Sequence, residues 1–267
     1  MNSVRQILEI DKVLEDVKFY IKTKNGFNII SNLDVFESRE LLEIELEKTK
    51  EMIDVINALN DLPIVSHIDI IEEINNCKKG SVLDEYKFNL IKEELLSIKE
   101  IIKFFNKLTV KPRYLSEQFL KLKFDESLYT KICNVITNEN KVANSASPKL
   151  NELRHKIEKI ERETKSTIAK LMITYKDQLS GDNYVLRDGV YVLPVNTSLK
   201  ANVEGIVHDI SDSGMTTFIE PSVIVNLENN KHILEFQERE EVTRILKELT
   251  YLVSTTSKAF SILLFEL

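Results

Sequence analysis

The sequence predicts a mainly α-helical protein, with a helical core and a long antiparallel, coiled-coil-like arm that carries a small antiparallel β sheet. Charged residues make up 30% of the 267 residues, Trp is absent and only 6 residues are Gly, a composition typical of long exposed helices. Apolar residues recur every three or four positions along most of the chain. β-formers are concentrated in residues 183–221, between two long helical patterns, so we expect the sheet at the far end of the arm.

The first half of the chain predicts a helical core over residues 1–137. Apolar residues at helical spacing begin at Ile7, and Thr23 with Asn25-Gly26 is expected to end this first helix. A second short helix, carrying Phe27, Ile29 and Ile30, is expected to follow. Ser38 and Asp84 each precede a long apolar-periodic segment, and both are predicted to be helix N-caps.

Two coiled-coil patterns flank the β-rich stretch. The first follows Ser147-Pro148, which predicts an N-cap with proline in the first helical turn. In both patterns the apolar positions step by three and four. They are Leu150, Leu153, Ile157, Ile160, Thr164, Thr167 and Leu171 before the sheet, and Val242, Ile245, Leu249, Leu252, Thr256, Ala259 and Leu263 after it.

We therefore predict an outgoing helix in residues 138–182, a β tip in 183–225 and a returning helix in 226–267. The outgoing helix is basic and the returning helix acidic, which favours their pairing.

Turn residues divide the β tip into strands. Asp188-Gly189, between runs of β-formers, is the strongest short hairpin signal in the chain. The turn residues from Ser211 to Gly214 separate two further strands, 206–208 and 216–219.

Several tip residues have expected structural roles. We expect Gly205 and Gly214 to adopt backbone angles that other residues resist. His208 is expected to bond to the backbone. Asp209 and Ser211 are expected to fix the turn through hydrogen bonds from backbone groups to their side chains.

The segment from Lys103 to Lys131 combines basic and aromatic side chains. Such interleaving occurs on nucleic-acid surfaces, where bases stack on rings and cations contact phosphates. The candidate contacts in this segment are Lys111, Arg113, Lys121 and Lys123. The same pattern arises when the rings lie in a helical core and the lysines cover its solvated face, and that interpretation is the more common one.

Charge and cysteine usage exclude several classes of protein. A net charge of −7 argues against non-specific nucleic-acid binding by the whole surface, although it allows a local basic patch. Cys77 and Cys133 lack a metal-binding or redox spacing and no signal peptide is evident, so we expect a reduced, cytoplasmic protein. No apolar run approaches the roughly 18 residues of a membrane span, so we expect no membrane partner.

We expect no catalytic residues, metal site or cofactor in this chain. The four histidines are scattered, and no Ser or Cys has the setting of a nucleophile. His208, Asp209, Asp212 and Glu220 are metal-ligating residue types, but their spacing matches no known ligand frame.

Four motifs occur in a fixed order along the chain, namely LEIDKVLEDV from Leu8, SASPKL from Ser145, YVLPV from Tyr191 and GIVHDISDSGMTTFIEP from Gly205. Their order and spacing resemble the second MutS family of bacteria, the MutS paralogues without a mismatch-reading domain. The last motif is similar to the clamp signature of that family. The resemblance implies that this chain is only the N-terminal core, lever and clamp region, ending inside the returning lever helix. Family members continue into a P-loop ATPase, which uses ATP and Mg, and often into a nuclease domain. The phosphate-binding motif G-x-x-x-x-G-K-S/T is absent from this sequence.

The resemblance also implies how the region acts. The two arms of a homodimer would close around DNA, branched or duplex, with the β tips on the phosphate backbone. Arg187 and Lys200 are the candidate contacts at the tip. The residues that match the structural clamp motif are Asp188, Gly189, Pro194, Gly205, His208, Asp209, Gly214, Glu220 and Pro221. Val190 and Asn196 stand where the family often has basic residues, and acidic residues outnumber basic ones at this tip, so binding by this region alone is expected to be weak.

Three functions remain open at this point. The chain is the non-catalytic DNA clamp of an ATP-dependent protein in DNA repair or suppression of recombination, or it contacts ribosomal RNA or protein in the rescue of stalled ribosomes. The third alternative is a helical scaffold or dimerisation module that binds another protein. Without the ATPase region, we expect a monomer or a weak dimer.

Overall fold

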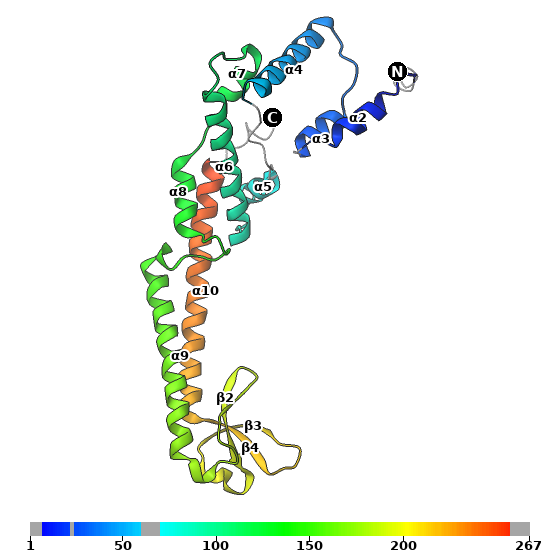
Figure 1. Ribbon diagram of the computed structural model, residues 1–267. Helices are drawn as coiled ribbons and strands as arrows, with labels where there is room; N and C mark the ends of the chain where they lie inside the picture. Colours follow the sequence, from blue (N-terminus) through cyan, green and yellow to red (C-terminus); the bar gives the residue numbers. More distant parts are fainter. Residues whose placement is uncertain (1–6, 22–23, 60–69, 257–267) are drawn as a thin grey trace. The chain divides into compact units, whose positions relative to one another are not determined.

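The computed structural model describes residues 7–21, 24–59 and 70–256, and it divides into two compact units. Unit 1 comprises Met1–Ala143 with Leu246–Leu267, and unit 2 comprises Asn144–Ile245. The fold is mainly α-helical with one small antiparallel sheet, which confirms the predicted fold class (Figure 1). The α-helices of unit 1 are α2 (Ile10–Lys18), α3 (Lys24–Ser31), α4 (Arg39–Leu59), α5 (Ile71–Lys78), α6 (Glu85–Asn106), α7 (Arg113–Leu120) and α8 (Glu126–Val135). Unit 2 contains α9 (Pro148–Thr174) and the first part of α10 (Ser222–Thr256).

Both predicted N-caps of unit 1 are confirmed. Ser38 Oγ accepts a hydrogen bond from the backbone N–H of Leu41 at 3.2 Å, and the Asp84 carboxylate accepts one from Lys87 at 2.9 Å. The predicted break between two helices is present, since α2 ends at Lys18 and α3 begins at Lys24, but it lies earlier than expected because Asn25 and Gly26 already belong to α3. Thr23 lies outside the described residues. A single glycine costs a helix only about 1 kcal/mol relative to alanine, which does not by itself end a helix.

The core of unit 1 is built on α6. Four apolar side chains on one face of this helix are almost fully buried, namely Phe88, Ile91, Leu95 and Ile98. Buried residues of α8 and of the last part of α10 add to this core, among them Leu128 and Val253. A buried hydrogen bond from the backbone N–H of Leu83 to Thr250 Oγ1, at 3.1 Å, ties α10 to the residues before α6.

A carboxylate of α4 caps α7. The residue before α7 is Pro112, which offers no capping side chain. Glu51 of α4 instead accepts hydrogen bonds from the backbone N–H groups of Arg113, Tyr114 and Leu115, at 2.7, 2.9 and 3.0 Å. The first N–H groups of a helix have no partner within the helix, so this single side chain replaces a local cap.

The two helices of unit 2 run antiparallel. Ser147 Oγ caps α9 by accepting from the Leu150 N–H at 3.0 Å, as predicted, and donates to Glu241 of α10 at 2.8 Å. Further along, Arg154 pairs with Glu238 at 2.7 Å. Residues with higher numbers on α9 therefore lie opposite lower numbers on α10, which is the predicted direction.

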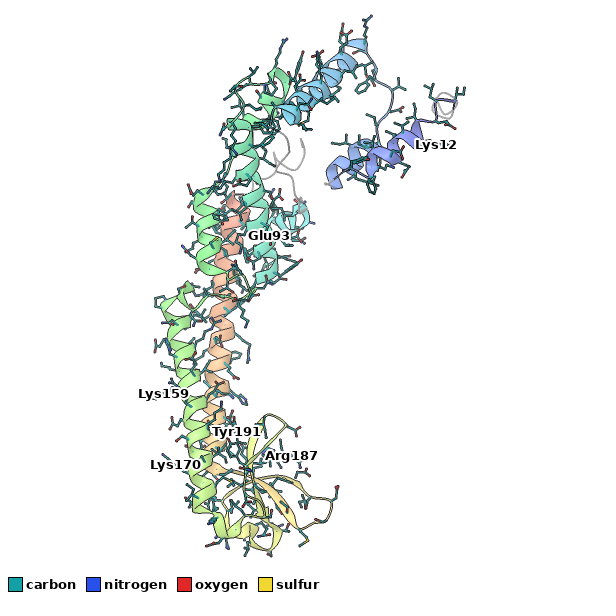
Figure 2. All side chains as sticks on the ribbon, viewed as in Figure 1. Lys12, Glu93, Lys159, Lys170, Arg187 and Tyr191 are labelled. Carbon is teal, nitrogen blue, oxygen red and sulfur yellow. The ribbon has the colours of Figure 1, made fainter. Side chains whose placement is uncertain are left out.

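The predicted coiled-coil positions face away from solvent. All seven positions on α9 are buried or half-buried, as are those on α10 as far as Thr256. Ala259 and Leu263 lie outside the described residues. Pairing between the charged limbs is narrower than predicted, because in the described part of the chain the ion pairs from α9 to α10 come from Lys149 and Arg154. Lys159 and Lys170 project from α9 away from α10 (Figure 2).

The sheet has four antiparallel strands in the order β1-β2-β4-β3, with β1 at Val185–Arg187, β2 at Val190–Asn196, β3 at Gly205–Ile210 and β4 at Thr216–Pro221. The hairpin predicted at Asp188-Gly189 is confirmed, with φ angles of 49° and 84°, as a type I′ turn requires. Both strands predicted around the Ser211–Gly214 turn are also present, and they pair with each other. A bulge between Val207 and Asp209 shifts the β3–β4 register.

An apolar cluster joins the sheet to the helices of unit 2. Leu193 and Val195 of β2 and Ile219 of β4 are almost completely buried against Ile168 of α9 and Ile224 of α10. The cluster thus gathers the last part of α9, the inner face of the sheet and the first turn of α10. α10 begins directly after β4, at Ser222, inside the range expected for the tip.

Glu241 generates a prediction of pH-dependent stability. The hydrogen bonds from Arg244 are the main reason that the pKa of this carboxyl falls from 4.5 to about 2, with Ser147 and Lys149 contributing. Its folded pKa lies below the unfolded value, so the stabilisation is complete above about pH 4.5 and is lost as the pH falls toward 2. Glu241→Gln should remove this pH dependence of stability. We expect the change to cost about 1–2 kcal/mol at pH 7, less than the full pKa shift implies, because water close to a two-helix layer screens the charge.

The measurement is urea unfolding followed by circular dichroism between pH 7 and pH 3. Glu240→Gln is the matched control, because this neighbouring side chain is exposed. If the two variants lose stability equally at pH 7, the Glu241 network contributes nothing specific.

The capping role of Glu51 is tested by Glu51→Ala. The change leaves three backbone N–H groups without their carboxylate partner, so we expect a loss of about 1–3 kcal/mol and faster amide hydrogen exchange in α7. Glu47→Ala, on an exposed position of the same helix, should change neither quantity. Unchanged exchange at Arg113 to Leu115 in the Glu51 variant would contradict the assignment.

Candidate nucleic-acid interface

Arg187, a predicted tip contact, is held in place by two other side chains. Its guanidinium lies 3.1 Å from the Asp209 carboxylate and 4.4 Å above the centroid of the Phe218 ring. The side chain remains 43% exposed. Arginine carries five N–H donors and the hydrogen bond to Asp209 uses one nitrogen, so the guanidinium can still bind a phosphate oxygen. Figure 2 shows Arg187 on the tip sheet.

Lys200, the second predicted contact, is exposed on a short 3-10 helix, η3 (Thr197–Asn202). The hydroxyl of Thr197 lies 3.0 Å from that of Thr217, and the Thr197 N–H donates to the Met215 carbonyl, so the start of η3 is fastened to β4. Within the described ranges, the Lys200 ammonium has no ion pair, which leaves it available to a solvent-side partner.

The β3–β4 turn forms as predicted. Ser211 Oγ accepts from the Thr216 N–H at 3.0 Å, and Asp209 accepts from the Ile210 N–H at 2.8 Å. Gly214 has a φ of 69°, so its predicted backbone role is confirmed.

Two predictions for β3 are corrected by the structure. His208 bonds to a side chain rather than to the backbone, because its Nε2 lies 2.7 Å from an oxygen of the buried Glu220 carboxylate. Gly205 does not adopt a positive φ. A Cβ at this position would lie 2.1 Å from the Glu220 carbonyl oxygen, so the glycine is required by the close approach of β4.

Pro194 lies in an inner strand, where the missing N–H must not face a partner. Its carbonyl accepts from the Ser180 N–H at 2.9 Å, on the side away from β4. In a strand the N and O of one residue point to the same side, so the ring nitrogen also faces away from β4. β1 pairs only as far as Val192, so the proline interrupts neither ladder.

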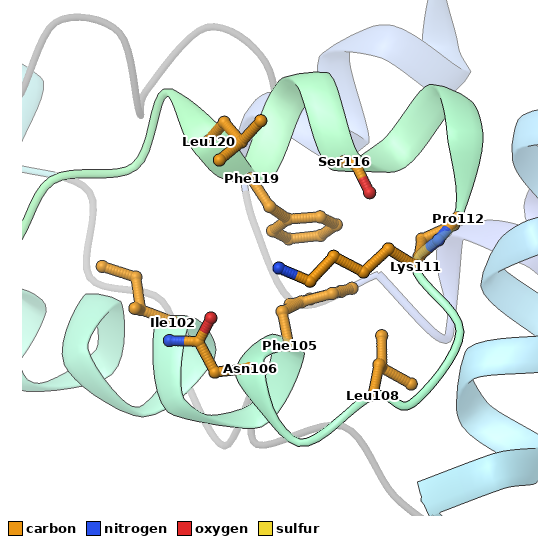
Figure 3. A pocket seen from close by; sticks show the side chains of 9 residues that line it. All are labelled: Ile102, Phe105, Asn106, Leu108, Lys111, Pro112, Ser116, Phe119 and Leu120. Atoms are coloured by element: carbon orange, nitrogen blue, oxygen red, sulfur yellow. The ribbon is translucent and has the colours of Figure 1, made fainter.

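The candidates in the basic and aromatic segment all belong to unit 1, and all four side chains are exposed. The Arg113 guanidinium lies 5.2 Å from the centroid of the Tyr114 ring. Lys121 is the C-cap residue of α7, and Lys123 lies two residues after it in the chain. Lys111 lines a pocket with Phe105 and Phe119 (Figure 3). Phe104 and Phe105 are buried, so the core interpretation holds for these two rings.

Sequence reasoning did not identify the cap that Glu51 provides to Arg113 and its neighbours, nor the pairing of His208 with Glu220. Both contacts join residues that are distant in sequence, and no local motif signals them. In the part of the chain that the structure describes, no three His, Cys, Asp or Glu side chains are grouped to hold a metal ion. None of the helices among these residues is both long enough and apolar enough to cross a membrane.

Gly205 generates a stability prediction for the tip. Gly205→Ala places a methyl group against the β4 backbone, so we expect a loss of about 2–4 kcal/mol and faster exchange of the β3–β4 amides. Gly181→Ala is the control, because its Cβ would lie 3.6 Å from the Pro194 ring, an ordinary contact. If the two variants are equally stable, β3 and β4 can move apart at Gly205 without a loss of stability, and the close approach does not require a glycine.

Comparison with curated proteins finds relatives that align with nearly the whole chain. This chain is 32% identical over 254 residues to Endonuclease MutS2 of Thermotoga neapolitana, and the alignment covers 95% of this chain and 33% of the relative. It is 31% identical over 255 residues to Endonuclease MutS2 of Clostridium perfringens (strain 13 / Type A), covering 94% and 32%. No family model matches. The chain thus spans about a third of the length of the curated relatives it matches, and over more than nine-tenths of its own length it is a homologue of the MutS2 proteins, a family of MutS paralogues.

Proposed function

We propose that this chain is the non-catalytic lever and clamp region of a MutS2-type, ATP-dependent protein that binds DNA. The observation that carries the proposal is the arrangement of unit 2, in which a paired helical arm ends in a sheet that presents Arg187 and Lys200 to solvent. The homology supports it, since the relatives are named endonucleases and the chain matches about a third of their length. ATP hydrolysis, Mg and any nuclease activity then belong to other regions of the whole protein, which acts in the cytoplasm.

The clamp would bind the phosphate backbone rather than bases. Arg187 offers a rigid guanidinium, because Asp209 and the Phe218 ring fix its position before any ligand arrives. Lys200 offers a mobile point charge. Two cations per tip give weak binding, so in a homodimer of the whole protein the two tips would act together on branched or duplex DNA.

The test is fluorescence anisotropy of the chain with a four-way DNA junction, a plain duplex and a ribosomal RNA helix across a salt series. The double variant Arg187→Gln and Lys200→Gln should weaken junction binding about tenfold or more and lower the salt slope by about two. Tighter binding to the RNA helix than to either DNA would favour the ribosomal target over DNA.

The control is Lys141→Gln with Lys247→Gln, which removes the same charge from two exposed positions of unit 1. If the tip variant and this control bind equally, the tip cations are not the contact, and a scaffold that binds another protein becomes the better account. Thermal unfolding by circular dichroism checks that the β1–β2 hairpin survives the loss of the Arg187 contacts.

A further inference from the structure

A row of exposed cations lies on the solvent side of α9, in unit 2. It consists of Lys159, Arg162 and Lys170, with the exposed Ser166 between the last two, and the steps of three and four place all of them on one face of the helix. We propose that this row, called the α9 track below, binds the phosphate backbone of a DNA duplex. The proposal rests on the proposed function, which sets DNA as the partner, and it adds a contact outside the tip. Figure 2 shows Lys159 and Lys170 pointing away from α10.

The cations at the start of α9 are already used within the protein. Lys149 and Arg154 form ion pairs with carboxylates of α10, at 3.5 and 2.7 Å. Lys156 forms an ion pair with Glu152 on α9 itself. These side chains hold the helices of unit 2 together or neutralise each other, so they are poor candidates for binding an external anion.

The cations of the α9 track are not used in this way. Lys159 and Lys170 form no ion pair and no side-chain hydrogen bond with another residue that the structure describes. Arg162 donates from Nε to the backbone carbonyl oxygen of Glu158 at 3.3 Å, which neutralises no charge and leaves its two terminal nitrogens as donors. The second half of α9 therefore carries positive charge that has no partner among the described residues.

Acidic side chains are scarce along this half of α9. Residues 164–176 contain three lysines and no Asp or Glu. Glu161 interacts electrostatically with Lys231 of α10, so it lies on the side of α9 toward the helix pair. Glu163 is an exposed carboxylate one turn after Lys159 and is the acidic group that opposes the track. A local basic excess is what attracts phosphate, and it exists here although the chain as a whole has a net charge of −7.

The shape of the α9 track favours a duplex over a single strand. α9 contains no Phe, Tyr or Trp, so the track has no platform on which unpaired bases could stack. Lys159 and Lys170 are 11 residues apart, which corresponds to about 16 Å along the helix axis. One strand of a DNA duplex presents about five phosphates in that length. Ser166 and Ala169 lie among the cations, and their short side chains allow a backbone to approach closely.

The α9 track ends at the level of the sheet. Ile168 belongs to the apolar cluster beneath the sheet, and Lys170 follows two residues later on the exposed side of α9. In the view of Figure 2, Lys170 and Arg187 lie at opposite sides of unit 2. The track is therefore a contact of its own rather than an extension of the tip cations.

The experiment measures binding of a labelled 20-base-pair DNA duplex across a salt series by fluorescence anisotropy. The track variant, Lys159→Gln with Arg162→Gln and Lys170→Gln, is compared with its parent both in the unmodified chain and in the chain that carries Arg187→Gln and Lys200→Gln. In the second comparison the tip cations are absent, so removal of the three track charges should weaken the remaining binding about fivefold or more. The slope of affinity against salt should fall by about two to three.

Two controls separate the α9 track from general charge. Lys107→Gln with Lys141→Gln and Lys247→Gln removes the same charge from exposed positions of unit 1 and should change affinity less than about twofold. Glu163→Gln should act in the opposite direction and tighten duplex binding about twofold, whereas Glu139→Gln in unit 1 should not. Equal effects of the two triple variants would overturn the proposal.

A cleavage experiment locates the duplex directly. An iron–EDTA probe attached to the thiol of a Ser166→Cys variant should cut the bound duplex, whereas the same probe on Gln237→Cys, at an exposed position of α10, should cut it several-fold less. Both variants carry Cys133→Ser, because Cys133 is exposed, whereas Cys77 is buried. Absence of cutting from Ser166→Cys would overturn the track. Tighter binding of an RNA duplex or of polyglutamate of equal charge would overturn DNA as its occupant.

The α9 track and the tip can fail independently. If the change at Arg187 and Lys200 leaves duplex binding unaltered while the track variant weakens it, the tip contact of the proposed function is wrong and the track stands. The reverse result keeps the tip contact and overturns the track. Circular dichroism checks that every variant retains the helical content of the unmodified chain.

Discussion

Unit 2 depends on the apolar cluster beneath its sheet. Two paired helices and four short strands have no thick core of their own, and isolated helices are marginal in water. Ile168, Leu193 and Ile219 are each at most 1% exposed, and a fully buried side chain of this type contributes about 1.5–3 kcal/mol. Because α9, the sheet and α10 all meet in this cluster, the same contacts that fold the sheet also fix where the chain turns back. The helical arm and its tip are therefore one cooperative structure.

A polar network fixes the helix pair of unit 2 at its opposite end. Ser147 caps α9 and bonds to Glu241 of α10, so the start of one helix is tied to a defined turn of the other. Between the two ends the packing is partly polar, with Thr164 and Glu228 both buried. Thr164 Oγ1 finds no hydrogen-bond partner in the described part of the chain, and such a group weakens the layer that contains it. The register is thus set at the ends rather than in the middle.

The sequence predicts those features whose cause is local. Asp188-Gly189 carries its own turn geometry, and Ser147-Pro148 carries its own cap, so both could be recognised without a structure. Gly205 was assigned the wrong reason, since its constraint comes from a carbonyl of β4 fifteen residues away. His208 finds its partner across the same strand pair. The pocket beside Lys111 could not be predicted, because Asn106 and Ser116, which also line it, have no pattern that distinguishes them from solvated residues until α6 and α7 pack together.

Counting charges at the tip overstates the repulsion that a phosphate would meet. The sequence has more acidic than basic residues there, which argued for weak binding. In the structure, however, the Asp209 carboxylate is paired with Arg187, and Glu220 is buried with His208 against it. Neither acts as an isolated surface charge. Asp209 orients the guanidinium and lowers the entropy lost when a ligand binds, so part of the acidic excess supports the contact that it was expected to oppose.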